Sequence, residues 1–107
     1  STGTVTVSYP PPPVFTSTSA TASGKLVVVA WSAAPEGGVV SYVVFASSRP
    51  DSLFRAVAGP VAPGPGSYSV SLPRTVGSYF KVSANLLDGT TASSAVFEVS
   101  KGAAWER

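Results

Sequence analysis

The sequence of 107 residues contains no cysteine, methionine, histidine, glutamine or isoleucine, and only one asparagine. The absence of cysteine excludes disulfide bonds and zinc–thiolate sites. The absence of histidine and cysteine also removes the commonest general base and the commonest thiol nucleophile. These absences alone exclude most of the familiar enzyme and metal chemistries.

Charged residues are also scarce, at 11% of the chain, with seven basic and five acidic side chains and a net charge of +2. The basic residues are scattered, so they form no footprint for nucleic acid. The acidic residues lie in predicted turns, in the tail or on an outer strand face, with no pair for glycoside hydrolysis and no alternating run for calcium. They are Glu36, Asp51, Asp88, Glu98 and Glu106. We therefore expect no catalytic site, no metal site and no cofactor.

Long apolar runs are missing as well: the longest, Leu26 to Trp31, has six residues, against the roughly 18 that a membrane span needs. Hydrophobic residues nevertheless make up 44% of the chain, whereas soluble domains usually carry about 25% charged residues. This balance predicts a surface that contacts other protein rather than a membrane. The lack of heat-labile residues, together with ten prolines, favours a thermophilic source, although a GC-rich genome gives the same bias.

What the sequence does contain is a series of short strand-like segments separated by glycine- and proline-rich turns. Seven such strands in about 90 residues predict a single all-β domain, a Greek-key β-sandwich. The segment "GPVAPGPG" at 59–66 has three prolines and is expected to lie outside the sheets. The expected strands are 14–20, 26–31, 39–46, 53–58, 67–72, 78–86 and 95–100.

The strand expected at 39–46 has apolar residues on both faces. Strict alternation places Val39, Val43 and Phe45 on the outward face, opposite the row that contains Tyr42. Tyr79 and Lys81 share that outward face if the strands 39–46 and 78–86 are neighbours. The resulting apolar stripe is a candidate contact surface, unless long loops such as 59–66 cover it.

The order and spacing of these segments resemble a fibronectin type III domain of the prokaryotic kind. The resemblance rests on "PPPPVFTSTSATASG", "LVVVAWS", "GGVVSYVVFASS", "LPRTVGSYFKVSA" and "LDGTTASSAVFEVS". It implies an immunoglobulin-like sandwich in which Trp31 and Tyr42 pack in the core rather than form a sugar-binding platform. The implied inward positions also include Leu72, Phe80, Val82 and Ala84.

Two positions depart from the resembled pattern. The family's corner tyrosine falls at Ser78, while the tyrosine itself is one place on at Tyr79, so either the corner is lost or a bulge shifts the register. The loop Leu87-Asp88-Gly89-Thr90 lacks the Arg-Gly-Asp triplet of the family's cell-attachment loop. Asp88-Gly89 is therefore interpreted as turn chemistry.

The segment Thr4 to Tyr9 predicts an extra strand, with Val5, Val7 and Tyr9 alternating with polar residues. Four prolines follow and prevent a tight hairpin onto the next strand; in polyproline geometry they form a spacer of roughly 12 Å. The strand is the end of a preceding domain, a disordered leader, or a strand donated to a neighbouring subunit. In the last case its three apolar side chains form the subunit interface.

The chain thus divides into an N-terminal extension (1–13), a fibronectin type III-like domain (14–100) and a C-terminal tail (101–107). Trp105 in the tail is a further contact candidate, although it could equally pack on its own domain. A chain that begins at Ser1 is either a processed secreted protein or a trimmed piece.

These observations lead to two functional hypotheses. The first is a non-catalytic structural subunit of an extracellular or cell-surface filament from a thermophilic prokaryote, assembling head to tail with copies of itself. The alternative is a single module of a larger secreted enzyme or adhesin, acting as a spacer or as a weak carbohydrate- or protein-binding unit. Neither hypothesis involves nucleic acid or membrane insertion, and contact with a cell surface or polysaccharide fits both.

Overall fold

The computed structural model describes residues 11–101, which form an all-β structure with one short 3-10 helix, η1. Alternating apolar residues and β-branched side chains produce strands wherever one strand face can be buried. The elements are β1 (Val14–Ser23), β2 (Leu26–Ala34), β3 (Val39–Ser47), β4 (Arg55–Val61), β5 (Ser67–Pro73), η1 (Arg74–Val76), β6 (Tyr79–Leu86), β7 (Thr91–Ser93) and β8 (Phe97–Lys101).

The strands form one mixed, nearly closed sheet with the order β4-β3-β6-β8-β1-β2-β5, and β7 pairs with β6 beside this path. Most pairs are antiparallel, but β8 runs parallel to β1 over Ala20–Ala22. The same strand pairs with β6 through Phe97 and Glu98. β8 therefore connects one half of the sheet to the other.

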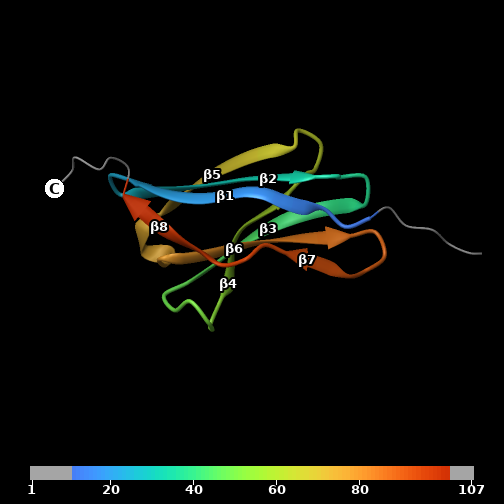
Figure 1. The fold of residues 1–107 in the computed structure, drawn as a ribbon. Coiled ribbons are helices and arrows are strands. Elements are labelled where there is room, and N and C mark those ends of the chain that lie inside the picture. The colour runs from blue at the N-terminus through green and yellow to red at the C-terminus, as the bar shows by residue number, and fades with distance from the viewer. Residues whose placement is uncertain (1–10, 102–107) are drawn as a thin grey trace, which may run out of the picture.

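The two halves lie as layers on either side of the core (Figure 1). One layer contains β1, β2 and β5; the other contains β3, β4, β6 and β7. The described chain begins at one end of the molecule and β8 finishes at the other. We call these ends the N-terminal pole, with the turns 35–38 and 87–90, and the C-terminal pole, with the turn 24–25 and η1.

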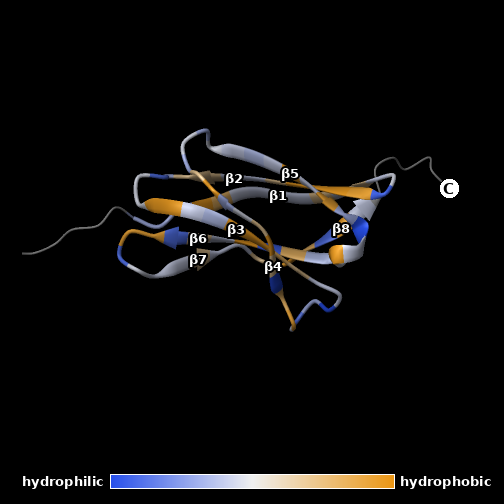
Figure 2. Ribbon diagram, turned by 180° about the vertical axis from the view of Figure 1, so that it is seen from behind, coloured by the Kyte–Doolittle hydropathy of each residue, from blue (hydrophilic) through white to orange (hydrophobic). Residues whose placement is uncertain are grey.

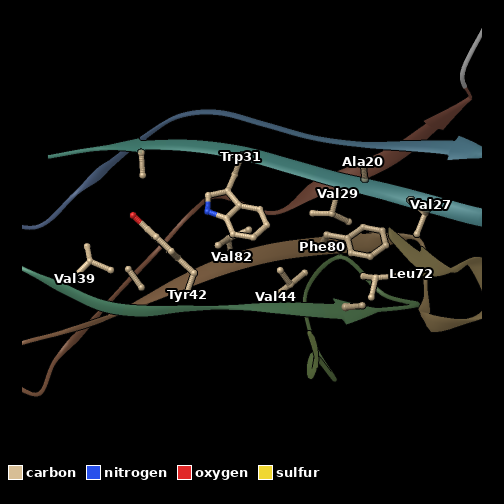
Figure 3. Close-up of a cluster of buried hydrophobic side chains, with 13 residues drawn as sticks. Ala20, Val27, Val29, Trp31, Val39, Tyr42, Val44, Leu72, Phe80 and Val82 are labelled. Carbon is tan, nitrogen blue, oxygen red and sulfur yellow. The ribbon is translucent and has the colours of Figure 1, made fainter. Parts of the chain in front are cut away.

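The core lies between the layers and is built mainly from β2, β3 and β6 (Figure 3). Trp31 extends from β2, and Tyr42 rises from β3 to meet it. The inward positions expected on β2, β5 and β6 are all buried, as are Trp31 and Tyr42, so those predictions are confirmed. The buried hydrophobic residues are Ala20, Val27, Val29, Trp31, Ala33, Val39, Tyr42, Val44, Ala46, Leu72, Phe80, Val82 and Ala84.

The predicted strands all occur, with shifts at their ends, but two details were wrong. β4 covers 55–61 rather than 53–58, so part of "GPVAPGPG" does lie in the sheet. Pro60 is tolerated because β4 is an end strand that pairs only with β3, and its register is irregular there. β7 was not predicted, because a strand of only three small residues, Thr91-Ala92-Ser93, has almost no periodicity.

The outward placement of Val39 was also wrong. Val39 is only 6% exposed and belongs to the core, whereas Val40 is 52% exposed. The cause is a register irregularity between Val39 and Ser41 in the pairing of β3 with β6. One irregularity turns over the side chains on one side of it, so strict alternation fails only at the start of the strand.

No such irregularity interrupts β6 around the expected corner tyrosine. The pairing of β3 with β6 is continuous from Ser41 with Asn85 to Ser47 with Tyr79. Phe80 points inward and is fully buried, while Tyr79 is half-buried on the outward side. Of the two possibilities left open by the sequence, a shift of register between Tyr79 and Asn85 is therefore excluded.

Two glycines with similar φ angles allow a controlled test of the packing around Gly77 at the C-terminal pole. Gly77 has φ +144°, and a Cβ built on it would lie 2.6 Å from the carbonyl oxygen of Ser47. Gly64 has φ +138° and nothing within 4 Å of the same position. We expect Gly77→Ala to lower the free energy of unfolding by about 1–3 kcal/mol more than Gly64→Ala, because only the former adds overpacking to backbone strain.

Urea unfolding followed by tryptophan fluorescence measures this difference. Equal losses in the two variants would contradict the close approach of Gly77 to Ser47.

Candidate functional site

A carboxylate and two tyrosine hydroxyls meet at the N-terminal pole. Glu36 lies in the turn between β2 and β3, while Tyr42 is on β3 and Tyr68 on β5. The Tyr42 hydroxyl donates to Glu36 Oε2 at 2.5 Å, and the Tyr68 hydroxyl donates to the same oxygen. The backbone N–H of Gly64 donates to Glu36 Oε1 at 3.2 Å and to the Tyr68 hydroxyl at 2.9 Å. Glu36 thus ties together segments from both layers.

Aromatic rings pack against this cluster on the side that faces the core. Tyr68 stacks on Trp31 with ring centroids 5.2 Å apart, and Tyr42 meets Trp31 edge to face at 5.8 Å. Phe15 of β1 contacts Tyr42 in a second edge-to-face pair at 6.2 Å. Such pairs contribute about 0.5–1.5 kcal/mol each beyond the area they bury. The rings therefore fix the positions of both tyrosine hydroxyls.

The electrostatics of the cluster favour an ionised Glu36. Partial burial raises the pKa of Glu36, but hydrogen bonds from Tyr42, Tyr68 and the Gly64 and Gly66 backbone outweigh it, so the net pKa lies below the ordinary value of 4.5. Burial and then the hydrogen bond to Glu36 raise the pKa of Tyr42 and, in the same order, that of Tyr68. Both tyrosines therefore remain protonated donors, and none of the three groups is poised to transfer a proton near neutral pH.

A pocket of about 240 Å³ opens at the same pole, between the segment that leads into β1 and the turn from β6 to β7. Hydrophobic residues gather at this pole, at the start of β3 and in the turn after β6 (Figure 2). Leu87 in that turn is 55% exposed. The lining residues are Pro12, Gly38, Leu86, Leu87, Asp88, Thr90, Thr91 and Ala92.

The rim of this pocket is a well-formed turn, as the sequence predicted for Asp88-Gly89. Asp88 Oδ1 accepts from the Thr90 backbone N–H at 2.9 Å and from the Thr90 hydroxyl at 2.6 Å. Hydrogen bonds from Thr90 hold the pKa of Asp88 below its ordinary value. The turn is anchored to the β2–β3 turn by the N–H of Leu87, which donates to the Gly38 carbonyl at 2.9 Å.

Two strand edges are open beside the pocket. β1 pairs with β2 along its length, but on its other side β8 reaches only Ala20–Ala22. Within residues 11–101 the first six residues of β1, 14–19, have no strand on that side. β7 pairs with β6, and its outer edge is likewise unpaired in this part of the chain. We call the gap between these two edges, which ends at β8, the seam.

Burial along the strands is consistent with a strand missing at the seam. On β1, Phe15 and Thr18 remain half-buried, whereas Ala20, where β8 begins to pair, is 1% exposed. Ala92 of β7 is half-buried, although Ala84, its partner on β6, is fully buried. The core is therefore covered less completely at the seam than beyond it.

The outward stripe predicted on β3 and β6 is partly covered. Phe45 pairs with Lys81, whose Nζ lies 5.8 Å from the Phe45 ring and 5.1 Å from that of Phe54. The Gly59 backbone approaches Val43, and an added Cβ there would lie 3.5 Å from its Cγ2. Val43, Phe45 and Tyr79 are half-buried and lie on neighbouring strands, so the structure brings these three together without Val39. Val5, Val7, Tyr9 and Trp105 lie outside the described residues.

Among residues 11–101, no group of three or more acidic side chains comes close enough to hold a metal ion. The same residues contain no helix long and apolar enough to cross a membrane. Comparison with known proteins finds no family model that matches the chain and no matching curated protein.

The sequence did not predict the cluster around Glu36, which was interpreted as a solvated turn acid. A usable signal was present, because Tyr42 was predicted to be buried and a buried tyrosine hydroxyl needs a hydrogen-bond partner. The nearest acid in the sequence, six residues earlier, is that partner. The contribution of Tyr68 depends on β5 lying beside β2, which no local pattern reveals.

The lowered pKa of Glu36 predicts a pH-dependent contribution to stability. Because the folded-state pKa is below the ordinary value of 4.5, this contribution is complete above about pH 4.5 and is lost as the pH falls through the folded-state pKa. We expect Glu36→Gln to unfold at a lower urea concentration than the parent chain at pH 7. We expect the difference between the two midpoints to shrink as the pH falls below about 4.5.

Asp51→Asn is the matched control, because Asp51 is exposed and its removal leaves the cluster intact. A constant difference between Glu36→Gln and the parent from pH 7 to pH 3 would contradict the role of the charge.

Proposed function

We propose that this chain is a non-catalytic structural subunit that associates with copies of itself by donating the strand Thr4–Tyr9 to a neighbour. Its setting is an extracellular or cell-surface filament of a thermophilic prokaryote. The domain is a fibronectin type III-like Greek-key sandwich in which β8 supplies only part of the last strand.

The observation that carries this proposal is the seam. Its β1 edge is six residues long, from Val14 to Ser19, and the expected strand Thr4–Tyr9 is also six residues long. An added strand there would cover side chains that are now half-buried, and its polar residues would face solvent.

The free energy of docking indicates why the donated strand needs an acceptor with two open strand edges. Burial of Val5, Val7 and Tyr9 contributes about 1.5–3 kcal/mol for each side chain, while ordering six residues costs about 1–2 kcal/mol per residue. These terms nearly cancel, so the balance depends on ladder hydrogen bonds at about 0.5–1.5 kcal/mol each. A strand between β1 and β7 makes such bonds on both sides.

The second candidate function is a spacer or weak binding module within a larger secreted protein. The observation that favours it is the separation of the chain ends: the described residues begin at one pole and finish at the opposite pole (Figure 1). Ends at opposite poles suit modules that are joined one after another in a row. In that case the first nine residues belong to the preceding module, and the domain is monomeric without them.

The decisive test compares the parent chain with a variant that lacks residues 1–9, by light scattering and negative-stain microscopy. We expect the parent to associate and the shortened chain to be monomeric with an unchanged circular dichroism spectrum. Equal masses for the two chains, both monomeric, would favour the module instead.

Charge placed on one face of the segment provides a matched control. The double variant Val5→Asp with Val7→Asp should be monomeric, because it puts two carboxylates on the face that is buried. Thr6→Asp with Ser8→Asp adds the same charge to the solvent face and should still associate. Loss of association in both double variants would indicate a simple charge effect rather than a donated strand.

A further inference from the structure

The open end of the seam and the start of the described chain lie at the same pole. The described chain begins at Pro11, and Pro12 lines the pocket together with Thr91 and Ala92 of β7. The seam opens at this pocket and ends where β8 pairs with Ala20. A strand that leaves one copy at this pole therefore meets an open seam only at the same pole of a second copy.

The direction of such a strand follows from this arrangement. Its C-terminal end, Tyr9, must stay near the pole because the spacer leads from there back to its own domain. Its N-terminal end, Thr4, then lies deep in the seam, towards Ser19. β1 and β7 both run away from the N-terminal pole, so the incoming strand is antiparallel to both. It can make ladder hydrogen bonds on either side, interrupted on β1 by the irregularity between Phe15 and Ser17.

This direction also places the side chains. Ala92 shares the inward face with Ala84, whereas Thr91 lies on the outward face. With Val5, Val7 and Tyr9 turned inward, Tyr9 reaches the pocket of about 240 Å³ beside Leu86 and Leu87. An apolar cavity of roughly 150 Å³ already accommodates benzene, so the pocket has room for the phenol ring.

We propose that two copies exchange these strands reciprocally, pole to pole, and form a closed two-fold dimer with Tyr9 of each copy in the pocket of the other. This inference rests on the proposed donation of Thr4–Tyr9 and specifies its acceptor and symmetry. Once the first strand has docked, the second is already beside the open seam, and its docking is intramolecular at an effective concentration of order millimolar. Strand donation then gives a closed pair of chains rather than the head-to-tail series expected from the sequence, and any longer assembly depends on contacts outside the seam.

Three other acceptors fit less well. The chain's own seam would require a reversal within Pro10–Pro13, whose fixed φ angles favour an extended spacer. The outer edge of β4 carries Pro60, which lacks a donor, and has an irregular register. At the C-terminal pole β8 already lies beside β1, so a head-to-tail donor meets a closed edge.

Because the chain has no cysteine, any disulfide that forms must join cysteines that are introduced. In the exchanged dimer, Ser8 of one copy lies on the outward face near Thr91 of the other. We expect the double variant Ser8→Cys with Thr91→Cys to oxidise to a covalent dimer, with a mass of two chains by light scattering and on a non-reducing gel. The matched variant Ser8→Cys with Lys25→Cys, whose second cysteine is exposed in the turn at the C-terminal pole, should remain uncrosslinked.

The other outcomes separate this inference from the proposed function. Crosslinking through Lys25→Cys, or an open-ended series of masses, would overturn the closed dimer while leaving strand donation intact. A disulfide within a single chain, seen as an oxidised monomer for Ser8→Cys with Thr91→Cys, would show that the segment occupies its own seam and would overturn both proposals. An uncrosslinked monomer in both variants would also overturn both.

Discussion

The structure depends on how one short strand is shared between two layers. β8 has five residues; it first pairs with β6 and then with β1. A strand that changes neighbours closes the sheet at the C-terminal pole but cannot also cover β1 near its start. Each backbone N–H and C=O on the uncovered edge then remains available for another partner. The seam is thus the direct consequence of where β8 crosses between the layers.

The N-terminal pole is held by different means, because strand pairing there is incomplete. Glu36 receives hydroxyl hydrogen bonds from β3 and β5 and an N–H from the loop before β5. Hydrogen bonds to a charged group contribute about 1.5–3 kcal/mol, roughly twice the neutral value. The stacked rings of Trp31 and Tyr68 extend this connection into the core. This pole can therefore keep its shape while the edges of β1 and β7 stay open.

The sequence predicted the parts of this fold that depend on local alternation, and failed where strands depend on distant neighbours. Tyr42 was placed correctly on the buried side of its strand, opposite Val43 and Phe45, because a period of two decides which side of a strand is buried. Val39 was misplaced because the irregularity beside it arises from pairing with β6. The seam could not be predicted, because nothing in the local sequence "SSAVFEVS" indicates where β8 changes from pairing with β6 to pairing with β1. The composition and the extra strand expected at Thr4 to Tyr9 led to the prediction of contact with other protein. They did not indicate which surface makes that contact.

In the proposed exchange, the proline run and the open edge act on different copies of the chain. Under the proposed donation, the four prolines keep the strand away from the open edge of its own chain, so that this edge stays available to a second copy. A stiff spacer also loses little entropy when its strand docks. The seam is short, lies between β1 and β7, and is closed by β8 at one end. It therefore accepts one strand in one direction, which limits the uncontrolled pairing that exposed edges allow. The crossing of β8 between the layers thus leaves part of the core uncovered and also limits which strand can cover it.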